Sequence, residues 1–506
     1  MTTKIEKYLL ELMILGLPFT ALPAIFSKYI SGKLSTDILL ILILFILWDI
    51  VNGHKINRQA VCYLVIMAFW GDFCIVYNLI YFPFINDLNT YNIHIVNTLH
   101  QNLSFVSKDT LQLVYYGIHS ELRFLAHYCF PCSLVYVIWH IYKNNDRQLL
   151  PLVEKSVFIL ACVMEFYSVF ELMWLKWGSG IGESFLTLVN PFLYDVASKS
   201  GWWPPLLWWN QLRSICVEPS FFGIIGALII PVLWKIQFKK QSVFTFFVSL
   251  FFDIMVFATN SRTAIIILLA QVIFLFIFGI YYKKQDFWRK IFKICCMVLI
   301  AFLMNIGLGY VSFLTPTDNT HKSSENVENV ENVISEYVNS NIKSVASTNK
   351  RSNLTRLDIL KSHLAMIEDS PLFGKGYDVY IPSLEYFCKA DLSKDIELNG
   401  YINDIHRDGF LHAGYPVVNE LSFTGVAMGL PGILLYLMPF IYVFYGMYKY
   451  RRQILNEENM FIVISLLGSI IALFSNEAFY SLYLCLGVLY TKIYNIRHPI
   501  DRFSKN

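Results

Sequence analysis

Charged residues are scarce in this chain. Only 15% of its 506 residues are Asp, Glu, Lys or Arg, and 56% are hydrophobic. A soluble domain carries about 25% charged residues, so the composition excludes an ordinary soluble protein. It predicts an all-α polytopic membrane protein, because a chain crossing lipid must satisfy its backbone internally. The formal net charge of +3 gives no indication of a nucleic-acid partner.

Signals for several enzyme classes are also missing. The expected cytoplasmic loops contain no Asp-X-Asp pair and no glycine-rich nucleotide loop, which argues against a sugar-nucleotide or ATP-dependent enzyme. His406 and His412 stand six residues apart, without a clean metal-ligand spacing, so we expect no metal and no cofactor. The first apolar segment lacks a small-residue cleavage site and is expected to remain as a helix.

The ten cysteines predict no disulfide framework. Most of them lie inside apolar runs, and only Cys388 falls in the largest loop. Cys129 and Cys132 have the spacing of a redox motif, but they lie within an expected membrane helix. We therefore interpret them as apolar core residues.

Apolar runs long enough to span a membrane recur along the chain. A membrane helix needs about 20 apolar residues. Twelve candidates cover residues 8–30, 35–52, 60–84, 121–142, 154–175, 217–236, 242–259, 262–282, 291–313, 421–448, 459–475 and 477–493. The predicted organisation is about nine spans within 1–313, one large periplasmic loop over 314–420, and about three spans with a cytoplasmic tail over 421–506.

Lys and Arg alternate between the connecting segments. Both termini are basic, and so are the segments 53–58, 143–155, 235–241, 283–293 and 449–452. The positive-inside rule therefore places both termini in the cytoplasm. The outer segments are then 31–33, 86–120, 178–212, 260–262, 315–420 and 475–477.

Residues 213–223 stand at the outer end of one span. Proline is well tolerated at the first helical position, so Pro219 predicts a helix start with Glu218 as its cap. Such a terminus is an anion site, and Arg213 just upstream has a planar charged fork suited to phosphate. The alternative is that Arg213 only anchors the chain at the interface and Glu218 is an ordinary cap.

The large loop contains one expected amphipathic helix, near 356–369. Apolar residues recur there at helical spacing, namely Leu357, Leu360, Leu364 and Ile367. Thr355 fits an N-cap, and Pro371 ends the helix. The helix is expected to lie on the outer membrane face, with Arg356 in its first turn.

Polar residues collect at this outer face. The candidates are Arg213, Glu218, Ser220, Asn260, Arg262, Arg356, His412, Asn419 and Glu420. Ionisable groups at membrane depth are functional candidates by default, and three arginines suit a diphosphate better than a cation. Arg262 is also compatible with a snorkelling anchor, and Asn476 and Glu477 need only link two helices.

Four motifs in the chain resemble those of bacterial O-antigen polymerases and the wider O-antigen polymerase and ligase superfamily. They are Arg213-x4-Glu218-Pro219-Ser220-Phe221-Phe222, Asn260-Ser261-Arg262-Thr263, the segment from Arg356 to Pro371-Leu372-Phe373-Gly374-Lys375-Gly376-Tyr377, and Gly429-Leu430-Pro431-Gly432. The resemblance covers about residues 210–435 by motif.

This resemblance implies a GT-C-like glycosyltransferase of the bacterial inner membrane that polymerises O-antigen repeat units at the periplasmic face. Donor and acceptor would be oligosaccharides on undecaprenyl diphosphate, with membrane lipid and a chain-length regulator protein as further partners. No metal is needed, because the lipid diphosphate is already a leaving group. Arg213 and Arg356 match the family's key arginines and are assigned to the diphosphate. Binding of substrate is assigned to Ser220, Asn260, Arg262, Asn419 and Glu420.

One position departs from the ligases of the superfamily, which carry a His-Asn pair before the Gly-x-x-Gly helix. Val418 takes the place of that histidine ahead of Asn419. This counts against a lipid A-core ligase and leaves the base open among Glu218, His412 and Glu420. The alternatives are a ligase, or a flippase of lipid-linked saccharide. A flippase needs polar residues at the membrane centre, where the spans look almost purely apolar.

Overall fold

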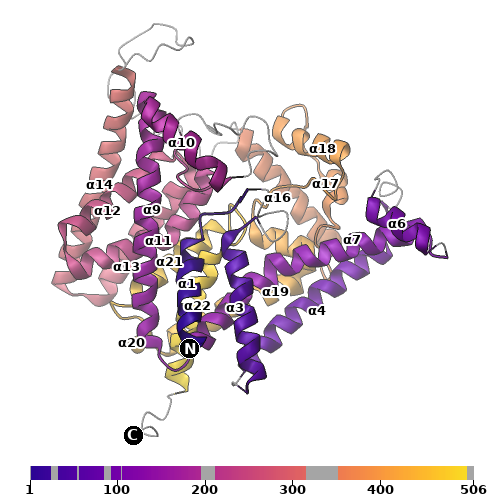
Figure 1. Ribbon diagram of the computed structural model, residues 1–506, viewed down its shortest axis with the longest axis horizontal. Coiled ribbons are helices and arrows are strands. Elements are labelled where there is room, and N and C mark those ends of the chain that lie inside the picture. The colour runs from indigo at the N-terminus through magenta and orange to yellow at the C-terminus, as the bar shows by residue number, and fades with distance from the viewer. Residues whose placement is uncertain are drawn as a thin grey trace.

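The computed structural model describes residues 2–23, 32–53, 56–84, 93–103, 105–194, 211–314 and 351–498. Regular structure in these ranges is helical throughout, without a β-strand. Long helices run side by side in a bundle, and α16, α17 and α18 lie together at its upper right (Figure 1). The predicted all-α polytopic membrane class is confirmed.

The helices divide into two sets along the chain. The first set comprises α1 (Thr2–Leu15), α3 (Leu34–Val51), α4 (Arg58–Ile80), α6 (His94–Asn102), α7 (Lys108–Phe124), η1 (Leu125–Cys129), α8 (Phe130–Tyr142), η2 (Asp146–Gln148), α9 (Leu149–Trp177) and α10 (Gly180–Leu193). The second comprises α11 (Pro219–Lys240), α12 (Val243–Ala258), α13 (Arg262–Tyr282), α14 (Gln285–Leu314), α16 (Arg351–Asp369), α17 (Ile381–Phe387), α18 (Ile396–Asp408), α19 (Glu420–Lys449), α20 (Arg451–Ile454), α21 (Met460–Ala472) and α22 (Tyr480–Arg497).

Eight helical segments in the described ranges are long and apolar enough to cross a membrane. The apolar helices α12 and α21 are shorter. Each predicted span overlaps a helix. However, α1 and α22 are not among the segments that are long and apolar enough to cross a membrane. The multi-pass character is therefore clear, whereas the count of twelve spans stays a prediction.

Two predicted outer loops are partly helical. The helix α7 begins at Lys108, well before the expected span 121–142, and α10 lies inside the expected loop 178–212. In α7, Gln112, Tyr116, Ser120 and Phe124 recur every four residues and form its buried face, and α7 packs against α4. This packing stabilises a helix whose mixed polarity did not identify it as part of a span.

The inner spans also contain acidic residues, contrary to the expectation of an almost purely apolar centre. Glu165 of α9 is 9% exposed and Asp253 of α12 is 1% exposed. These two helices pack against each other. Their carboxyl groups lie within long apolar runs, which is why the composition of the spans did not reveal them.

The predicted cytoplasmic segments meet at one end of the bundle. Lys235 Nζ lies 2.7 Å from a Glu154 carboxylate oxygen, and Lys284 Nζ lies 2.8 Å from Glu457. Lys7 Nζ donates to Gln148 Oε1 at 2.8 Å. The chain enters α1 and leaves α22 at this same lower end in Figure 1. We call it the basic face, and we call the opposite end, where α11, α13 and α19 begin, the polar face.

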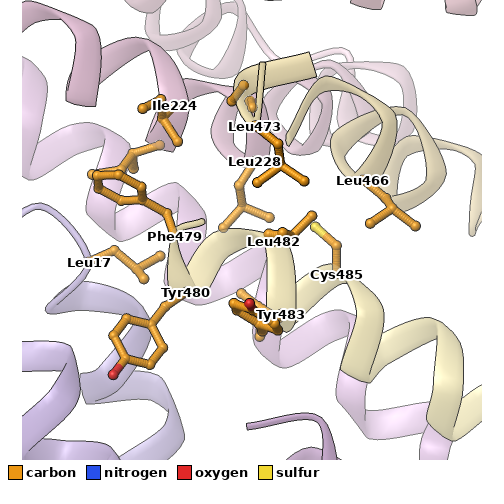
Figure 2. Packing of buried hydrophobic residues seen from close by; sticks show 14 of the residues in the cluster. Leu17, Ile224, Leu228, Leu466, Leu473, Phe479, Tyr480, Leu482, Tyr483 and Cys485 are labelled. Carbon is orange, nitrogen blue, oxygen red and sulfur yellow. The ribbon is translucent and has the colours of Figure 1, made fainter. Parts of the chain in front are cut away.

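The core is built around α11, which has apolar residues on all sides and is buried over most of its length. It packs against α9, α12, α13, α21 and α22. Figure 2 shows Ile224 and Leu228 of α11 close to Phe479 and Leu482 at the start of α22. A Cβ at Gly223 would lie 2.5 Å from the Ala264 Cβ. This glycine therefore lets the heads of α11 and α13 approach closely.

Candidate functional site

The turn between α21 and α22, residues 473–479, is where the elements of the polar face meet. Arg356 Nη1 of α16 donates to the Ser475 carbonyl oxygen at 2.6 Å, and Thr263 Oγ1 of α13 donates to Ser475 Oγ at 3.4 Å. The backbone N–H of Glu420 donates to the Leu473 carbonyl at 2.9 Å. One turn thus holds the heads of α13 and α19 and the α16 arginine together.

Arg356 stands beside residues from α11 and α18. It is half-buried, and burial lowers the pKa of its guanidinium, while the charges of Glu218, Glu397 and Tyr401 act in the opposite direction, with Glu218 the strongest of the three. Arg262 of α13 donates to the Asn353 side chain of α16 and lies within electrostatic reach of Arg356. The structure therefore brings together three of the predicted site residues, which we call the arginine group: Glu218, Arg262 and Arg356.

Glu218 ends the segment before α11 in an extended conformation, and the helix begins at Pro219 as the sequence indicates. Its side chain makes no capping hydrogen bond to the described backbone. Ser220 Oγ donates to Glu218 Oε2 at 3.1 Å. The carboxylate thus lies within electrostatic reach of Arg356 and does not satisfy the orphan N–H groups of its own helix.

Arg213 lies apart from the other two arginines, inside the protein. It is 3% exposed, and its guanidinium carbon lies 4.6 Å from the centroid of the Tyr194 ring. Its Nε is 3.9 Å from Glu171 Oε1, and its Nη1 donates to the Val217 carbonyl at 3.4 Å. The guanidinium charge is thus compensated within the protein.

Glu171 of α9 organises the segment that contains Arg213. Its two carboxylate oxygens accept hydrogen bonds from the backbone N–H groups of Arg213 at 3.2 Å and Ser214 at 2.7 Å. Ser214 adopts a left-handed conformation with a φ of 56°. Tyr194 Oη donates to the Ile215 carbonyl at 2.8 Å. Sequence reasoning missed Glu171 and Tyr194, because an isolated acid or tyrosine near a helix end carries no motif.

The head of α13 is a turn followed by a cap. Asn260 adopts a left-handed φ of 48°, a conformation that asparagine tolerates better than most residues. Ser261 Oγ accepts from the Ala264 N–H at 3.4 Å and caps the helix. This local geometry directs Arg262 toward α16. A substrate-binding role for Asn260 or Ser220 stays a prediction.

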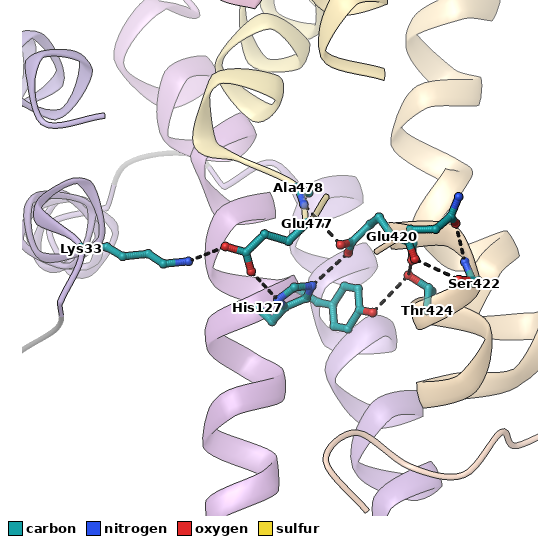
Figure 3. Close-up of polar contacts among 9 residues, drawn as sticks. Lys33, His127, Glu420, Ser422, Thr424, Glu477 and Ala478 are labelled. Atoms are coloured by element: carbon teal, nitrogen blue, oxygen red, sulfur yellow. Dashed lines mark hydrogen bonds and ion pairs between the residues drawn. The ribbon is translucent and has the colours of Figure 1, made fainter. Parts of the chain in front are cut away.

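A second polar group lies next to the arginine group, around the same turn (Figure 3). His127 Nε2 lies 2.9 Å from Glu420 Oε1, and its Nδ1 lies 3.8 Å from Glu477 Oε2. Lys33 Nζ lies 2.9 Å from Glu477 Oε1. Burial raises the pKa of Glu477, but Lys33 and His127 outweigh it, so that this pKa lies below its ordinary value.

Glu420 is fully buried and already has partners for both carboxylate oxygens. Besides the contact with His127, its Oε2 accepts from the Ala478 N–H at 3.2 Å. Asn419 caps α19, because its Oδ1 accepts from the Ser422 N–H at 2.9 Å. Both residues are therefore engaged in fixing the start of α19 to its neighbours, and their assignment to substrate binding stays a prediction.

His412 lies outside both groups. It is exposed and follows α18, within electrostatic reach of Asp408 and His119. In the part of the chain that the structure describes, no hydrogen bond or ion pair joins it to the arginine group. The geometry therefore gives no support for His412 as the base.

The loop helix α16 differs from its prediction in its start and in its buried face. It begins at Arg351, and Thr355 lies inside it, donating to Asp395 Oδ1 at 2.5 Å instead of capping the helix. Leu364, on the predicted apolar face, is 55% exposed. The buried residues are Thr355, Asp358, Ile359, Ser362, His363 and Met366. The face changes because α16 packs against α17, α18 and α19 instead of lying alone on a membrane surface.

His363 illustrates how polar this buried face is. It is 1% exposed, and burial lowers its pKa to about 4, so the imidazole is neutral near pH 7. Its Nδ1 lies 3.1 Å from Ser422 Oγ on α19. A neutral histidine bonded to a serine joins the two helices without introducing a charge between them.

Two of the four motifs contain paired glycines, namely Pro371 to Tyr377 after α16 and Gly429 to Gly432 in α19. These two glycine motifs contact each other, and we call this contact the interlock. The helix α19 is kinked at Gly429, where φ is 69°. Lys375 N–H donates to the Val426 carbonyl at 2.6 Å, and Leu430 N–H donates to the Pro371 carbonyl at 2.8 Å. A Cβ at Gly429 would lie 2.3 Å from the Leu372 carbonyl oxygen. The loop segment after α16 thus satisfies backbone groups that the kink leaves without helical partners.

All ten cysteines are free, with Cys132 buried and Cys129 partly buried. Within the described ranges, no three His, Cys, Asp or Glu side chains lie close enough to share a metal ion. Whether the reaction is independent of metal stays a prediction from the sequence.

Comparison with known proteins bears directly on this part of the fold. Residues 244–437 match the family model described as O-antigen ligase. A search of curated proteins finds no match. The matched segment begins in α12, ends in α19, and includes Arg262, Arg356 and both glycine motifs. The match supports a resemblance of this segment to the O-antigen polymerase and ligase superfamily, and it does not distinguish a polymerase from a ligase.

Proposed function

We propose that this protein is a polymerase of lipid-linked O-antigen or similar repeat units, acting at the periplasmic face of the bacterial inner membrane. The observation that carries the proposal is the arginine group, in which Arg262, Arg356 and Glu218 meet from three separate elements. Arg262 and Arg356 lie inside the segment that matches the O-antigen ligase family.

The proposed reaction moves a glycan from its lipid diphosphate to a sugar hydroxyl. The acceptor oxygen attacks the anomeric carbon of the donor, and the bond from that carbon to the phosphate oxygen breaks with its electron pair leaving on the diphosphate. Arg356 and Arg262 stabilise the leaving charge, for which guanidinium groups offer bidentate hydrogen bonds. The proton of the acceptor hydroxyl passes to a base.

Glu218 is the base that the contacts favour. Glu420 is fully buried and has partners for both of its oxygens, and His412 makes no described contact with the arginine group. The Glu218 carboxylate, in contrast, is half-buried and stands within electrostatic reach of Arg356. A carboxylate beside the arginines would repel a diphosphate, which is consistent with a role toward the acceptor.

Arg213 fits a positioning role better than direct contact with the diphosphate. Its charge is compensated by Glu171, and its bond to the Val217 carbonyl holds the residue that precedes Glu218. In this proposal, Arg213 acts on the reaction through the placement of Glu218. Binding of the diphosphate by Arg213 itself remains the sequence-based prediction against which this role can be tested.

An O-antigen ligase is the second candidate, because the family match fits it equally well. The polymerase is favoured by the residue at the position where ligases of the superfamily carry a histidine. Val418 stands there, is 5% exposed and has no titratable group.

The lipopolysaccharide profile of a strain lacking this protein separates the alternatives. A lost polymerase leaves a single repeat unit on the core, which is the result we expect. A bare core would contradict the proposal and indicate a lost ligase or flippase.

A further inference from the structure

A cavity lies at the basic face, far from the arginine group. It has a volume of about 400 Å³ and lies between the end of α11, the start of α12 and the first turns of α14. Its lining includes Phe238, Phe246, Lys290, Lys293, Met297 and Ile300. Since α11 has 22 residues and a helix rises about 1.5 Å per residue, this cavity and Glu218 are separated by about 33 Å along α11.

The wall of this cavity is apolar and firmly held. The Phe238 ring lies 5.2 Å from the Phe461 ring and 5.9 Å from the Phe287 ring, measured between centroids. Met297 is 2% exposed, whereas Ile300 is 42% exposed on the outer side of α14. The cavity therefore has a fixed inner wall and an outer edge that faces the surroundings of the bundle.

Two lysines give the cavity a positive charge. Lys290 Nζ lies 5.3 Å from the centroid of the Phe238 ring, and Lys293 follows it by three positions on the same face of α14. Nearby basic residues are ion-paired, with Lys284 on Glu457 and Lys235 on Glu154. Within the described ranges, neither lining lysine has a carboxylate partner, and no acidic residue lines the cavity.

We propose that this cavity binds one anionic phospholipid, whose phosphate lies between Lys290 and Lys293. One acyl chain would lie along the apolar wall formed by Phe238, Met297 and Ile300. Basic pockets between membrane helices at the cytoplasmic side bind anionic headgroups in this way. Free phosphate offers the same charge but makes no use of the apolar wall, and this difference separates the two ligands experimentally.

The site would hold a corner of the bundle together. The helix α14 packs against α12 and α13, and the cavity lies between its first turns and the end of α11. A lipid bound there would join α11, α12 and α14. This lipid site is independent of glycosyl transfer, because none of the residues that line the cavity lies at the polar face.

Native mass spectrometry of the full-length protein in detergent tests the site. We expect saturable binding of dioleoylphosphatidylglycerol that exceeds the binding of dioleoylphosphatidylcholine. Each lysine near an anionic headgroup changes affinity by about fivefold, so the double variant Lys290→Gln/Lys293→Gln should bind dioleoylphosphatidylglycerol about 25-fold more weakly. A matched control, Arg451→Gln/Arg452→Gln, removes the same charge from a different hollow, lined by residues 448–453, and should bind like the wild type.

A second variant tests the apolar wall without changing the charge. Ile300→Trp should fill the cavity from its partly exposed edge and abolish saturable binding of dioleoylphosphatidylglycerol. Wild-type affinity in the double-lysine variant would overturn the proposal. So would equal affinity for the zwitterionic lipid, or complete displacement of the lipid by inorganic phosphate at similar concentration.

Discussion

At the scale of single residues, burial separates the arginines that sequence similarity groups together. Arg213 is 3% exposed and paired with Glu171, while Arg356 is half-buried beside Glu218. One arginine is therefore part of the protein interior, and the other lies at the polar face. The two roles predict different consequences of substitution.

Replacement of Arg213 by alanine should destabilise the fold. Removing one member of a buried ion pair leaves the other uncompensated, and this typically costs about 3–5 kcal/mol. We expect Arg213→Ala to lower the unfolding temperature of the purified protein and its level in the membrane. A variant that accumulates and unfolds like the wild type, but no longer binds the lipid-linked donor, would instead favour direct contact of Arg213 with the diphosphate.

Replacement of Glu218 by glutamine tests its role as the base. The amide keeps the shape of the side chain but cannot accept the hydroxyl proton, and general-base catalysis contributes about 10²–10⁴-fold. We expect the single-turnover rate to fall within that range while lipid-linked donor still binds. Normal turnover would exclude Glu218 as the base and direct attention to Glu420.

At the scale of elements, the interlock between α19 and the segment after α16 explains two of the glycine motifs. Gly429→Ala places a methyl group 2.3 Å from the Leu372 carbonyl, at a positive φ. Strain of this kind costs about 1–3 kcal/mol, and we expect a lower unfolding temperature. Gly400→Ala is the matched control, since Gly400 lies inside α18 with open space around it. That control should be neutral or stabilising, and equal destabilisation of both variants would contradict the account.

Local signals in the sequence identified several of these elements. Pro219 marked the start of α11, and Ser261 capped α13, because both residues act on the backbone next to them. The polar group around His127 could not be found this way. His127 and its partner Glu420 are separated by 293 residues, and Lys33 and Glu477 by 444, so only the fold brings them together.

The buried face of α16 shows a different limit of sequence analysis. Helical spacing of apolar residues indicated a helix, and a helix is present. Which side is buried depends on α17, α18 and α19, whose side chains supply polar partners such as Asp395 and Ser422. A stripe of leucines identifies a helix but does not identify its neighbours.

At the scale of the whole molecule, the basic face and the polar face lie at opposite ends of the bundle. Predicted basic segments meet at one end of the bundle, and the arginine group lies at the other. Reporter fusions near residues 240, 285 and 452 should give cytoplasmic signals, and fusions near 190 and 340 periplasmic ones, since Lys and Arg are retained inside. A periplasmic signal at 285 would contradict the common outer face.

The proposed function depends most on Arg356, which we expect to act on the diphosphate at the polar face. Loss of one preorganised charged donor typically lowers a rate by about 10²–10³, and an ammonium does not reproduce the bidentate fork of arginine. Lys361→Ala on the same helix is the matched control, because Lys361 is exposed and paired only with Asp358 in the described structure.

The most direct measurement is the lipopolysaccharide profile of a deletion strain complemented with Arg356→Ala, Arg356→Lys or Lys361→Ala at equal protein levels. We expect single-repeat product with Arg356→Ala, little recovery with Arg356→Lys, and full-length polymer with Lys361→Ala. Full-length polymer with Arg356→Ala would contradict the account.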